Sequence, residues 1–381
     1  MTSDREWRAV VAAFILNGLF FGAWASRVPA FKDQFQLQPS TLGLLLLLLA
    51  GGAIVSFPLA GALSEKLGAR RLTLLCAAGY GPAFVLLSIA PNVLTFAVAL
   101  FLFGACHGAM DVAMNGWGAR VEARLKRSTM SIFHATFSLG AGVGAASGYF
   151  AATWGMLIVW HFATLAALSS AIAFAYMMAG NGTTKTPAAS KSTGPAFMLP
   201  PKSLLLVGLV AFSASMGEGA MADWSAVFLR LVVEVSEARA ALGYAVFSLM
   251  MVITRLLGGQ ILERFGAVVT IRASGTIAFI GLMISIFGGS FGAGLLGFAL
   301  AGIGYAVVMP VVFSRAAADP NFPPGLAIAS VATLGYGGML LGPPIVGFVA
   351  SYVGLQLSFL VLAGFALLAA SLAPSLSSRD A

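Results

Sequence analysis

The sequence predicts an all-α membrane protein with twelve transmembrane helices in two pseudo-symmetric six-helix bundles. Composition is the first reason. Of the 381 residues, 59% are hydrophobic and 9% are charged, whereas a soluble domain averages about 25% charged residues. The second reason is that the apolar residues form runs long enough to cross a bilayer. The third is that motifs in the first half of the chain recur in the second half.

A membrane-spanning helix needs about 20 apolar residues, and twelve such runs can be placed. They cover residues 8–30, 40–62, 72–90, 93–117, 129–153, 155–179, 203–228, 239–259, 269–289, 291–315, 325–350 and 354–373. Lysine and arginine favour cytoplasmic loops. If both termini are cytoplasmic, only four of the 21 basic residues lie outside, namely Arg27, Lys32, Arg230 and Arg239. This distribution predicts both termini in the cytoplasm and leaves no basic patch for nucleic acid.

One long polar segment, residues 180–202, separates the sixth and seventh runs. It is rich in Pro, Gly, Ser, Thr and Lys, a composition that cannot build a core. We therefore expect a flexible cytoplasmic linker between an N-terminal bundle, residues 1–179, and a C-terminal bundle, residues 203–381.

Two pairs of matching motifs relate the halves. GALSEKLGA at 61–69 matches GQILERFGA at 259–267 at an offset of 198, and GYFAATWG at 148–155 matches GFVASYVG at 347–354 at an offset of 199. The first match pairs Gly61 with Gly259, Glu65 with Glu263, Lys66 with Arg264 and Gly68 with Gly266. The matches indicate a duplicated six-helix unit, and such repeats usually place a binding site near the bilayer midplane.

Spans, repeat and linker together resemble those of the major facilitator superfamily over essentially the whole chain. The loop GALSEKLGARR resembles the family's signature G-x-L-x-D-[RK]-x-G-[RK]-[RK], with Glu65 where the family prefers Asp and Ala69 interrupting the basic run. The fitting residues are Gly61, Leu63, Lys66, Gly68, Arg70 and Arg71. The resemblance implies that this loop packs against the opposite half and controls cytoplasmic closure. Charged hydrogen bonds from Glu65 and Glu263 could hold it, and the alternative is that both are solvated loop charges.

A finer resemblance is to fucose-permease-like sugar–proton symporters and to related uncharacterised bacterial inner-membrane permeases. The symporters carry an acid followed four residues later by Asn on helix 4, as Asp111 and Asn115 do here. They also carry an Asp on helix 1, which has none here and offers Asn17 and Arg27 instead. EGAMADWSAVFL at 218–229 looks typical of the uncharacterised group. The resemblance implies a proton-coupled transporter of a small polar, sugar-like solute. We expect a monomer in the lipid bilayer of the bacterial inner membrane.

The stretch FGACHGAMDVAMNGWGAR at 103–120 carries the polar residues around which we expect the solute path. His107, Asp111 and Asn115 follow at steps of four, about 400° each, so they form one stripe. An isolated charge in hydrocarbon costs about 3 kcal/mol. Asp111 could therefore carry a proton in a wet cavity, or pair with an arginine of a neighbouring helix. Asn115 could bind solute or join helices, and His107, like His134 on helix 5, could titrate or bond a neighbour.

Helix 7 adds two acids and an indole. Glu218 lies between two glycines, which can loosen a helix where a solute approaches. Asp223 is about 140° away around the helix. We expect Glu218 to face the cavity and Asp223 a polar partner. Trp224 could stack on a solute ring or anchor the membrane interface.

Two arginines and one glycine row are expected to be structural. Arg27, near the outer end of helix 1, can snorkel toward water, and Arg255 can tie down the end of helix 8 or pair with an acid. Gly140, Gly144 and Gly148 leave one face of helix 5 nearly bare, so that a neighbouring helix can approach closely.

No residue pattern typical of an enzyme is found. Cys106 and His107 point about 100° apart on a helix, so they cannot act as nucleophile and base, and the sequence has no Walker-type phosphate loop. Cys76 and Cys106 have no metal-ligand spacing. We predict a secondary active transporter, without cofactor or metal, that works by alternating access. A drug–proton antiporter, a transporter-like receptor without flux and an uncoupled facilitator are the alternatives.

Overall fold

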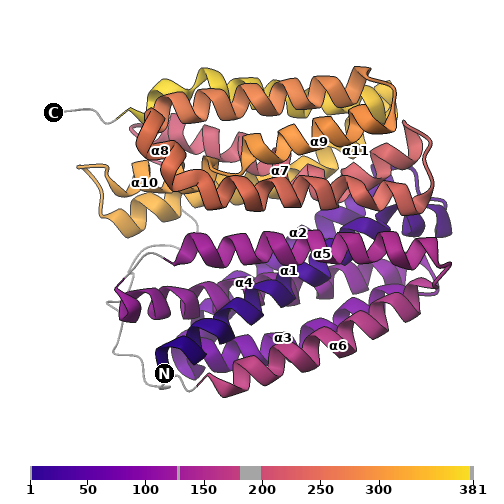
Figure 1. Cartoon of the computed structure of the whole chain (residues 1–381), viewed down its shortest axis with the longest axis horizontal. Helices are drawn as coiled ribbons and strands as arrows, with labels where there is room; N and C mark the ends of the chain where they lie inside the picture. The colour runs from indigo at the N-terminus through magenta and orange to yellow at the C-terminus, as the bar shows by residue number, and fades with distance from the viewer. Residues whose placement is uncertain (1, 127–128, 181–198, 378–381) are drawn as a thin grey trace. The chain divides into compact units, whose positions relative to one another are not determined.

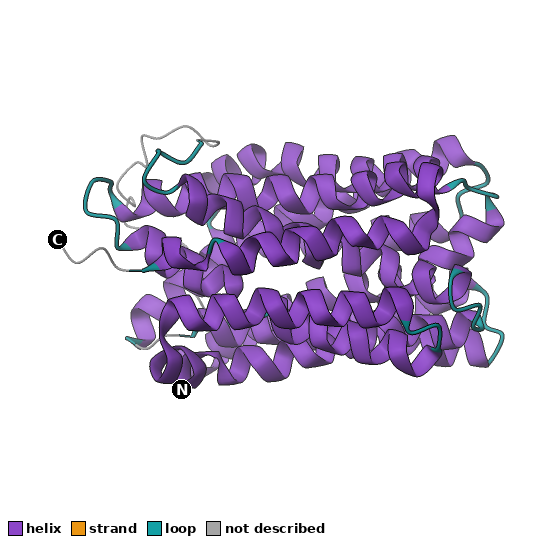
Figure 2. Cartoon of the chain, turned by 90° about the horizontal axis from the view of Figure 1, so that it is seen from above, coloured by secondary structure: helices purple, strands orange, loops and turns teal. Residues whose placement is uncertain are grey.

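The structure is a computed structural model that describes residues 2–126, 129–180 and 199–377. Most of the predicted linker, residues 180–202, lies outside the described residues. Within the described part the chain is helical and contains no strand (Figure 2). The predicted all-α fold class is confirmed.

Eleven α-helices and one 3₁₀ turn are described, and within each compact unit the helices lie side by side along their length (Figure 1). In chain order they are α1 (Thr2–Gln34), α2 (Pro39–Leu67), α3 (Ala69–Ser88), α4 (Val93–Leu125), α5 (Met130–Thr153), α6 (Ile158–Ala179), α7 (Leu205–Leu231), α8 (Glu237–Phe287), α9 (Phe291–Tyr305), α10 (Val308–Ala317), α11 (Pro324–Ser371) and η1 (Ala373–Leu376).

Nine segments of the described chain are long and apolar enough to cross a membrane. Two of them are too long for one crossing, because the 51 residues of α8 would extend about 75 Å, against a hydrocarbon core of about 30 Å. Non-helical backbone at Gly266 divides α8, and at Gly354 it divides α11. With these helices split, with α9 and α10 joined, and with α5 included, the described helices cover all the predicted spans.

The sequence repeat has a counterpart in the backbone. Gly68 has φ 84° and ψ 142°, and its repeat partner Gly266 has φ 74° and ψ 167°. Gly155 and Gly354, paired by the second match, also have positive φ, 65° and 82°. Residues with a side chain rarely adopt this conformation. Each glycine therefore marks a turn between two antiparallel spans, and the two halves turn at equivalent places.

The bare face of α5 does admit a neighbouring helix. A Cβ at Gly140 would collide with the backbone of Ile15 in α1, and one at Gly144 with the backbone of Leu19. From the other side, Gly18 of α1 lies against the backbone of Phe137. Helices that pack this closely gain van der Waals contact where lipid provides no hydrophobic force between them. The prediction from the glycine row is confirmed.

The same packing recurs between α7 and α11. A Cβ at Gly338 would collide with the backbone of Phe212, and one at Gly342 with that of Met216. These glycines lie 198 residues after Gly140 and Gly144. The close crossing of α1 with α5 is therefore repeated by α7 with α11.

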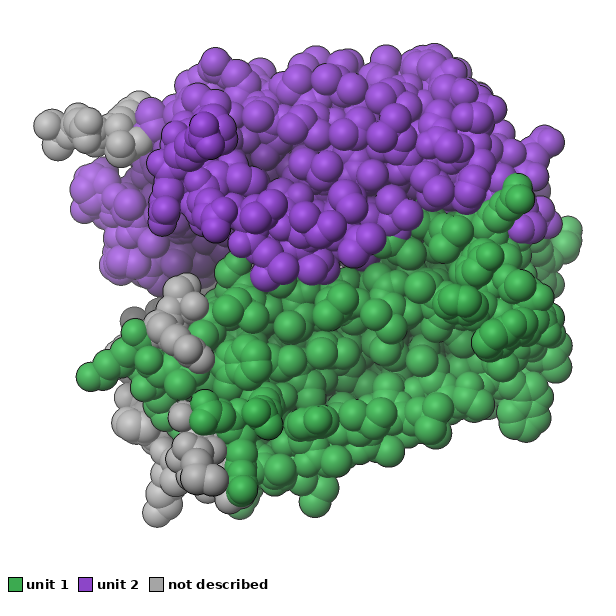
Figure 3. Space-filling model, viewed as in Figure 1, with its two compact units in different colours: residues 1–37, 45–189, 237–245 green, residues 38–44, 190–236, 246–381 purple. Residues whose placement is uncertain are grey.

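The chain divides into two compact units (Figure 3). Unit 1 comprises residues 1–37, 45–189 and 237–245, and unit 2 comprises residues 38–44, 190–236 and 246–381. The start of α2 thus belongs to unit 2, and the start of α8 belongs to unit 1. These two exchanged segments are themselves related by the repeat offset of 199.

A buried carboxylate ties the start of α1 to the end of α4. Glu6 is 4% exposed, accepts a hydrogen bond of 3.0 Å from Trp117 Nε1 and pairs with Arg124. A buried charge is tolerated when it is paired and hydrogen-bonded. Near the same end of unit 1, Gly180 lies directly against Ala9, so α6 ends beside the start of α1.

Candidate functional site

The polar stripe of α4 is partly exposed, and it contains a carboxylate held by an amide. The Asn115 Nδ2 atom donates to the backbone oxygen of Asp111 at 2.9 Å and to its Oδ1 at 3.0 Å. His107, Asp111 and Asn115 are each half-buried. Among the described residues Asp111 makes no ion pair, so the alternative of a fixed pair with a neighbouring arginine finds no support in this structure.

A tyrosine from α3 fixes the imidazole of His107. The Tyr80 hydroxyl lies 2.9 Å from His107 Nδ1 and 3.5 Å from the backbone oxygen of Asn17. A hydroxyl has one proton to donate, and the shorter contact is to Nδ1. This assignment leaves Nε2 of a neutral His107 carrying the ring proton and free to donate. Tyr80 is fully buried, and nothing in its sequence context indicates this role.

An aromatic side chain of α1 stacks on the other face of this site. The Phe21 ring lies 4.9 Å from the imidazole of His107 at an interplanar angle of 21°. It also meets Tyr244, from the start of α8, edge to face at 6.4 Å. Residues from α1, α3, α4 and the first turns of α8 therefore combine polar groups with an aromatic face within unit 1.

Asn17 is positioned as a helix contact. It is fully buried, and its Nδ2 donates to the sulfur of Met114 at 3.7 Å. Its Oδ1 is buried without a hydrogen-bond partner among the described residues. Asn17 therefore joins α1 to α4 directly behind the stripe, and it adds an unsatisfied acceptor there.

In unit 2, Arg255 pairs with an acid, as one of its two expected roles requires. Its Nη2 atom lies 3.2 Å from Glu218 Oε1, with the two side chains 11% and 18% exposed. Its Nε donates to the backbone oxygen of Ala306 at 3.2 Å. Proline has no N–H, so Pro310 leaves that oxygen, four residues earlier, without its helical partner. Arg255 supplies the missing donor to this oxygen, between α9 and α10.

The other two residues predicted on α7 are buried. Asp223 is 6% exposed, and Trp224 is fully covered. The Trp224 Nε1 donates to the backbone oxygen of Pro343 at 3.0 Å. In this structure Trp224 therefore packs α7 against α11, and neither stacking on a solute nor anchoring at the membrane interface describes it. Hydropathy alone could not distinguish a Trp224 packed between helices from one that faces lipid, because lipid and protein core are equally apolar.

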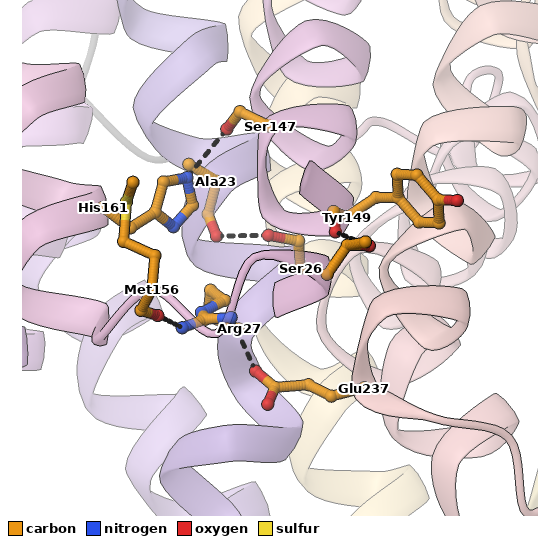
Figure 4. Close-up of polar contacts among 9 residues, drawn as sticks. Ala23, Ser26, Arg27, Ser147, Tyr149, Met156, His161 and Glu237 are labelled. Carbon is orange, nitrogen blue, oxygen red and sulfur yellow. Dashed lines mark hydrogen bonds and ion pairs between the residues drawn. The ribbon is translucent and has the colours of Figure 1, made fainter. Parts of the chain in front are cut away.

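Arg27 corrects a prediction. Instead of snorkelling, it is 3% exposed, lies 2.9 Å from Glu237 Oε1 and donates to the backbone oxygen of Met156 at 3.0 Å. Figure 4 shows Arg27 between these two partners. Burial without a counter-ion is too costly for a guanidinium, and Glu237 supplies that charge.

A histidine that the sequence did not single out lies beside Arg27 (Figure 4). His161 is 4% exposed, and its Nε2 lies 2.9 Å from the Ser147 hydroxyl. That hydroxyl donates its proton to the backbone oxygen of Gly144 at 2.6 Å, so Nε2 must be the donor to Ser147. His161 thus joins α6 to α5 through this hydrogen bond.

Two further predicted residues, His134 and Arg70, lie at the edges of unit 1. His134 is exposed and meets Phe14 edge to face at 5.5 Å. Arg70 donates to the backbone oxygens of Met177 and Met178 at the end of α6, where a cation also suits the helix dipole.

The two signature-like loops are open to solvent. Apart from the half-buried Arg70, their charged residues are exposed. Neither Glu65 nor Glu263 makes a hydrogen bond or ion pair with a described residue. Arg264 lies over the ring of Phe265 at 5.5 Å. A Cβ at Gly61 or Gly259 would meet no atom within 4 Å. Their predicted role in closure stays a prediction.

Among the residues that the structure describes, no group of His, Cys, Asp and Glu side chains is placed to hold a metal ion.

The fold agrees with the comparisons. The model of the Major Facilitator Superfamily matches residues 10–323. An uncharacterised transporter of Sinorhizobium fredii is 43% identical over 97% of this chain and 98% of its own length. An uncharacterised MFS-type transporter of Yersinia pestis is 36% identical over 91% of this chain and 89% of its own length. The membrane protein MosC of Rhizobium meliloti is 32% identical over 95% of this chain and 88% of its own length.

Solved structures share the fold at low identity. The nucleoside transporter NupG matches with a TM-score of 0.78 at 12% identity, covering 98% of this chain and 100% of its own. The fucose:proton symporter FucP of E. coli matches with a TM-score of 0.64 at 18% identity, covering 97% and 98%. The chain belongs to the Major Facilitator Superfamily, and it is a multi-pass membrane transporter.

Proposed function

We propose that this transporter moves a small polar, sugar-like solute together with protons, and that Asp111 carries the proton. One observation carries the proposal: Asp111 lies half-buried on a membrane-spanning helix and its partner is an uncharged amide. A carboxylate in hydrocarbon is costly, and here no described cation offsets that cost. Protonation removes the charge.

The neighbouring groups suit both proton transfer and solute binding. The amide of Asn115 orients one carboxylate oxygen, and the described residues provide no partner for the other. His107, held by Tyr80, offers an Nε2–H donor one turn away. Hydroxyl groups of a solute can replace water at these positions, and the Phe21 ring provides an apolar face for its carbon skeleton.

The comparisons favour a polar solute. FucP is a fucose:proton symporter and NupG is a nucleoside transporter, and both solutes carry hydroxyl groups. We infer bacterial inner-membrane location and cytoplasmic termini from the basic residues. The solute path would open to the two sides of the membrane in turn.

The solute is first identified by a thermal-shift screen of purified protein against sugars, organic acids and cationic drugs at two pH values. A ligand that binds the folded state raises its apparent stability, by about 2.7 kcal/mol at a hundredfold excess over Kd. Stabilisation by polyols or sugars supports the proposal. Stabilisation by cationic drugs alone would favour a drug–proton antiporter.

Proton coupling is then tested in proteoliposomes with Asp111→Asn. Asparagine resembles the protonated carboxyl in size but cannot release a proton, so accumulation driven by a pH gradient should disappear while solute exchange persists. Glu234→Gln is the matched control, because Glu234 is exposed. Accumulation that continues unchanged in Asp111→Asn would remove Asp111 from the coupling role.

A further inference from the structure

A groove between α1 and α6 in unit 1 takes no part in the proposed transport site. It encloses about 480 Å³. Its lining includes Arg8, Val11, Ile15 and Leu19 from α1, and Ile172 and Tyr176 from α6. Ile172 is 60% exposed and Tyr176 is 49% exposed, so the groove opens to the surroundings of the bundle.

The groove is apolar along its length. Its α1 residues follow at spacings of three and four, and so do those of α6, so one stripe of each helix faces it. Three lining residues are polar: Arg8, Ser169 and Tyr176. The Ser169 hydroxyl is already satisfied, because it donates to the backbone oxygen of Leu165 at 2.6 Å. The groove therefore suits a hydrocarbon chain.

The length of the groove matches one leaflet of a bilayer. From residue 8 to residue 19, α1 rises about 16 Å at 1.5 Å per residue. Half of a hydrocarbon core of about 30 Å is about 15 Å. A lipid of one leaflet, with its polar head at Arg8, would extend its chain to the level of Leu19.

The charge at the mouth has no partner in the described part of the chain. Arg8 is exposed and makes no ion pair or hydrogen bond with a described residue, in contrast to Arg124 with Glu6 and Arg27 with Glu237. Tyr176 lies in the last turn of α6, and this end of α6 adjoins the start of α1 through Gly180 and Ala9. A cation and a hydroxyl therefore lie at one end of an apolar groove.

We propose that this groove binds one anionic phospholipid, with an acyl chain along α1 and α6 and its phosphate against Arg8 and Tyr176. Guanidinium and phosphate form strong charge-assisted hydrogen bonds. The cytoplasmic leaflet is rich in anionic lipids. This site does not depend on the coupling role of Asp111.

Native mass spectrometry of the full chain in a neutral detergent tests the site. Phosphatidylglycerol and phosphatidylcholine with identical acyl chains are titrated separately. Arg8→Gln should weaken phosphatidylglycerol binding about fivefold and leave phosphatidylcholine binding unchanged. Arg5→Gln is the matched control, because Arg5 is also exposed and basic but does not line the groove. Equal losses in both variants would show diffuse surface attraction and overturn the proposal.

The acyl-chain position needs its own variants. Ala12 and Ile172 both line the groove. Ala12→Phe and Ile172→Trp should each fill it and weaken the binding of both lipids, while thermal unfolding without added lipid checks that the fold is intact. Binding at wild-type affinity in a folded variant would overturn the proposed position. Glycerol 3-phosphate at millimolar concentration should not displace the lipid, and displacement would show an ordinary phosphate site instead.

Discussion

The Arg27 guanidinium at the end of α1 lies 2.9 Å from the Glu237 carboxylate at the start of α8. Both residues belong to unit 1, although α8 continues into unit 2 from residue 246. Arg27 is almost fully buried, while the Glu237 side chain is 34% exposed. The pair therefore compensates a buried cation with a carboxylate that retains contact with solvent.

We expect Arg27→Gln and Glu237→Gln each to destabilise the protein. Breaking a buried ion pair costs about 3–5 kcal/mol, and an exposed pair contributes about 0–1 kcal/mol. This pair is intermediate, so a loss of about 2 kcal/mol is expected in Glu237→Gln, which leaves Arg27 unpaired. The measurement is the free energy of unfolding in detergent.

The double variant distinguishes the pair from unrelated effects. If the two residues interact, Arg27→Gln with Glu237→Gln should cost less than the sum of the single changes, because the double variant leaves no charge unpaired. Strict additivity would show that the contact contributes nothing to stability.

The close crossing of α1 and α5 predicts a second effect on stability. Gly144→Leu would place a side chain where the backbone of Leu19 lies, and overpacking typically costs about 1–3 kcal/mol or more. Gly51→Leu is the control, since a Cβ there meets no atom within 4 Å. Thermal unfolding should show a clear loss for Gly144→Leu and little change for Gly51→Leu. Similar losses in both would mean that α5 does not depend on its bare face.

The hydrogen bond between Tyr80 and His107 predicts a change in solute affinity. Tyr80→Phe removes the donor to Nδ1, so the ring proton is no longer confined to Nε2 and the donor toward the solute is lost part of the time. A net hydrogen bond is worth about 0.5–1.5 kcal/mol, which is about two- to tenfold in Kd. Calorimetric titration with the solute found in the screen measures this.

Tyr352→Phe is the control for that titration, because Tyr352 is 75% exposed. An unchanged Kd in Tyr80→Phe would mean that His107 does not contact the solute. A changed Kd in both variants would point to a general effect of losing a hydroxyl.

Local rules explain which features could be predicted from the sequence. The apolar spans and the glycine row depend on neighbours along one helix, and the structure confirms helices at these places, although α1 and α4 extend beyond the predicted bounds. The repeat follows from matching motifs, and the backbone turns at equivalent glycines. The Asp111 and Asn115 contact follows from a spacing of four residues. The Arg27 and Glu237 pair could not be predicted in this way, because 210 positions separate the partners.

The sequence pattern also could not predict which side chains bind backbone carbonyl oxygens of another helix. Arg255 binds the oxygen of Ala306 because Pro310 lacks an N–H. A proline in an apolar run signals a freed carbonyl, but it does not indicate which side chain from another helix will bind it. The burial of Trp224 was undetermined for a related reason, since its partner, the oxygen of Pro343, belongs to the distant α11.

The last prediction concerns the paired loops with Glu65 and Glu263. In this structure both carboxylates are exposed. If they hold the cytoplasmic side closed in another state of the transport cycle, removing either should favour the inward-open state by about 1–3 kcal/mol, the usual range of conformational coupling. A reporter cysteine in the cytoplasmic half of the solute path should then react faster in Glu65→Ala and in Glu263→Ala, and one in the periplasmic half should react more slowly.

The native cysteines must be replaced first, because Cys76 and Cys106 are free and partly exposed. Asp33→Ala removes an acid from outside both loops and serves as the control. A solvated surface charge contributes about 0–1 kcal/mol, too little to change the labelling of both reporters in opposite directions. Labelling rates equal to those of the parent in both loop variants would show that Glu65 and Glu263 are solvated loop charges with no role in closure. Opposite changes in the two reporters would place them in the closure of the cytoplasmic side.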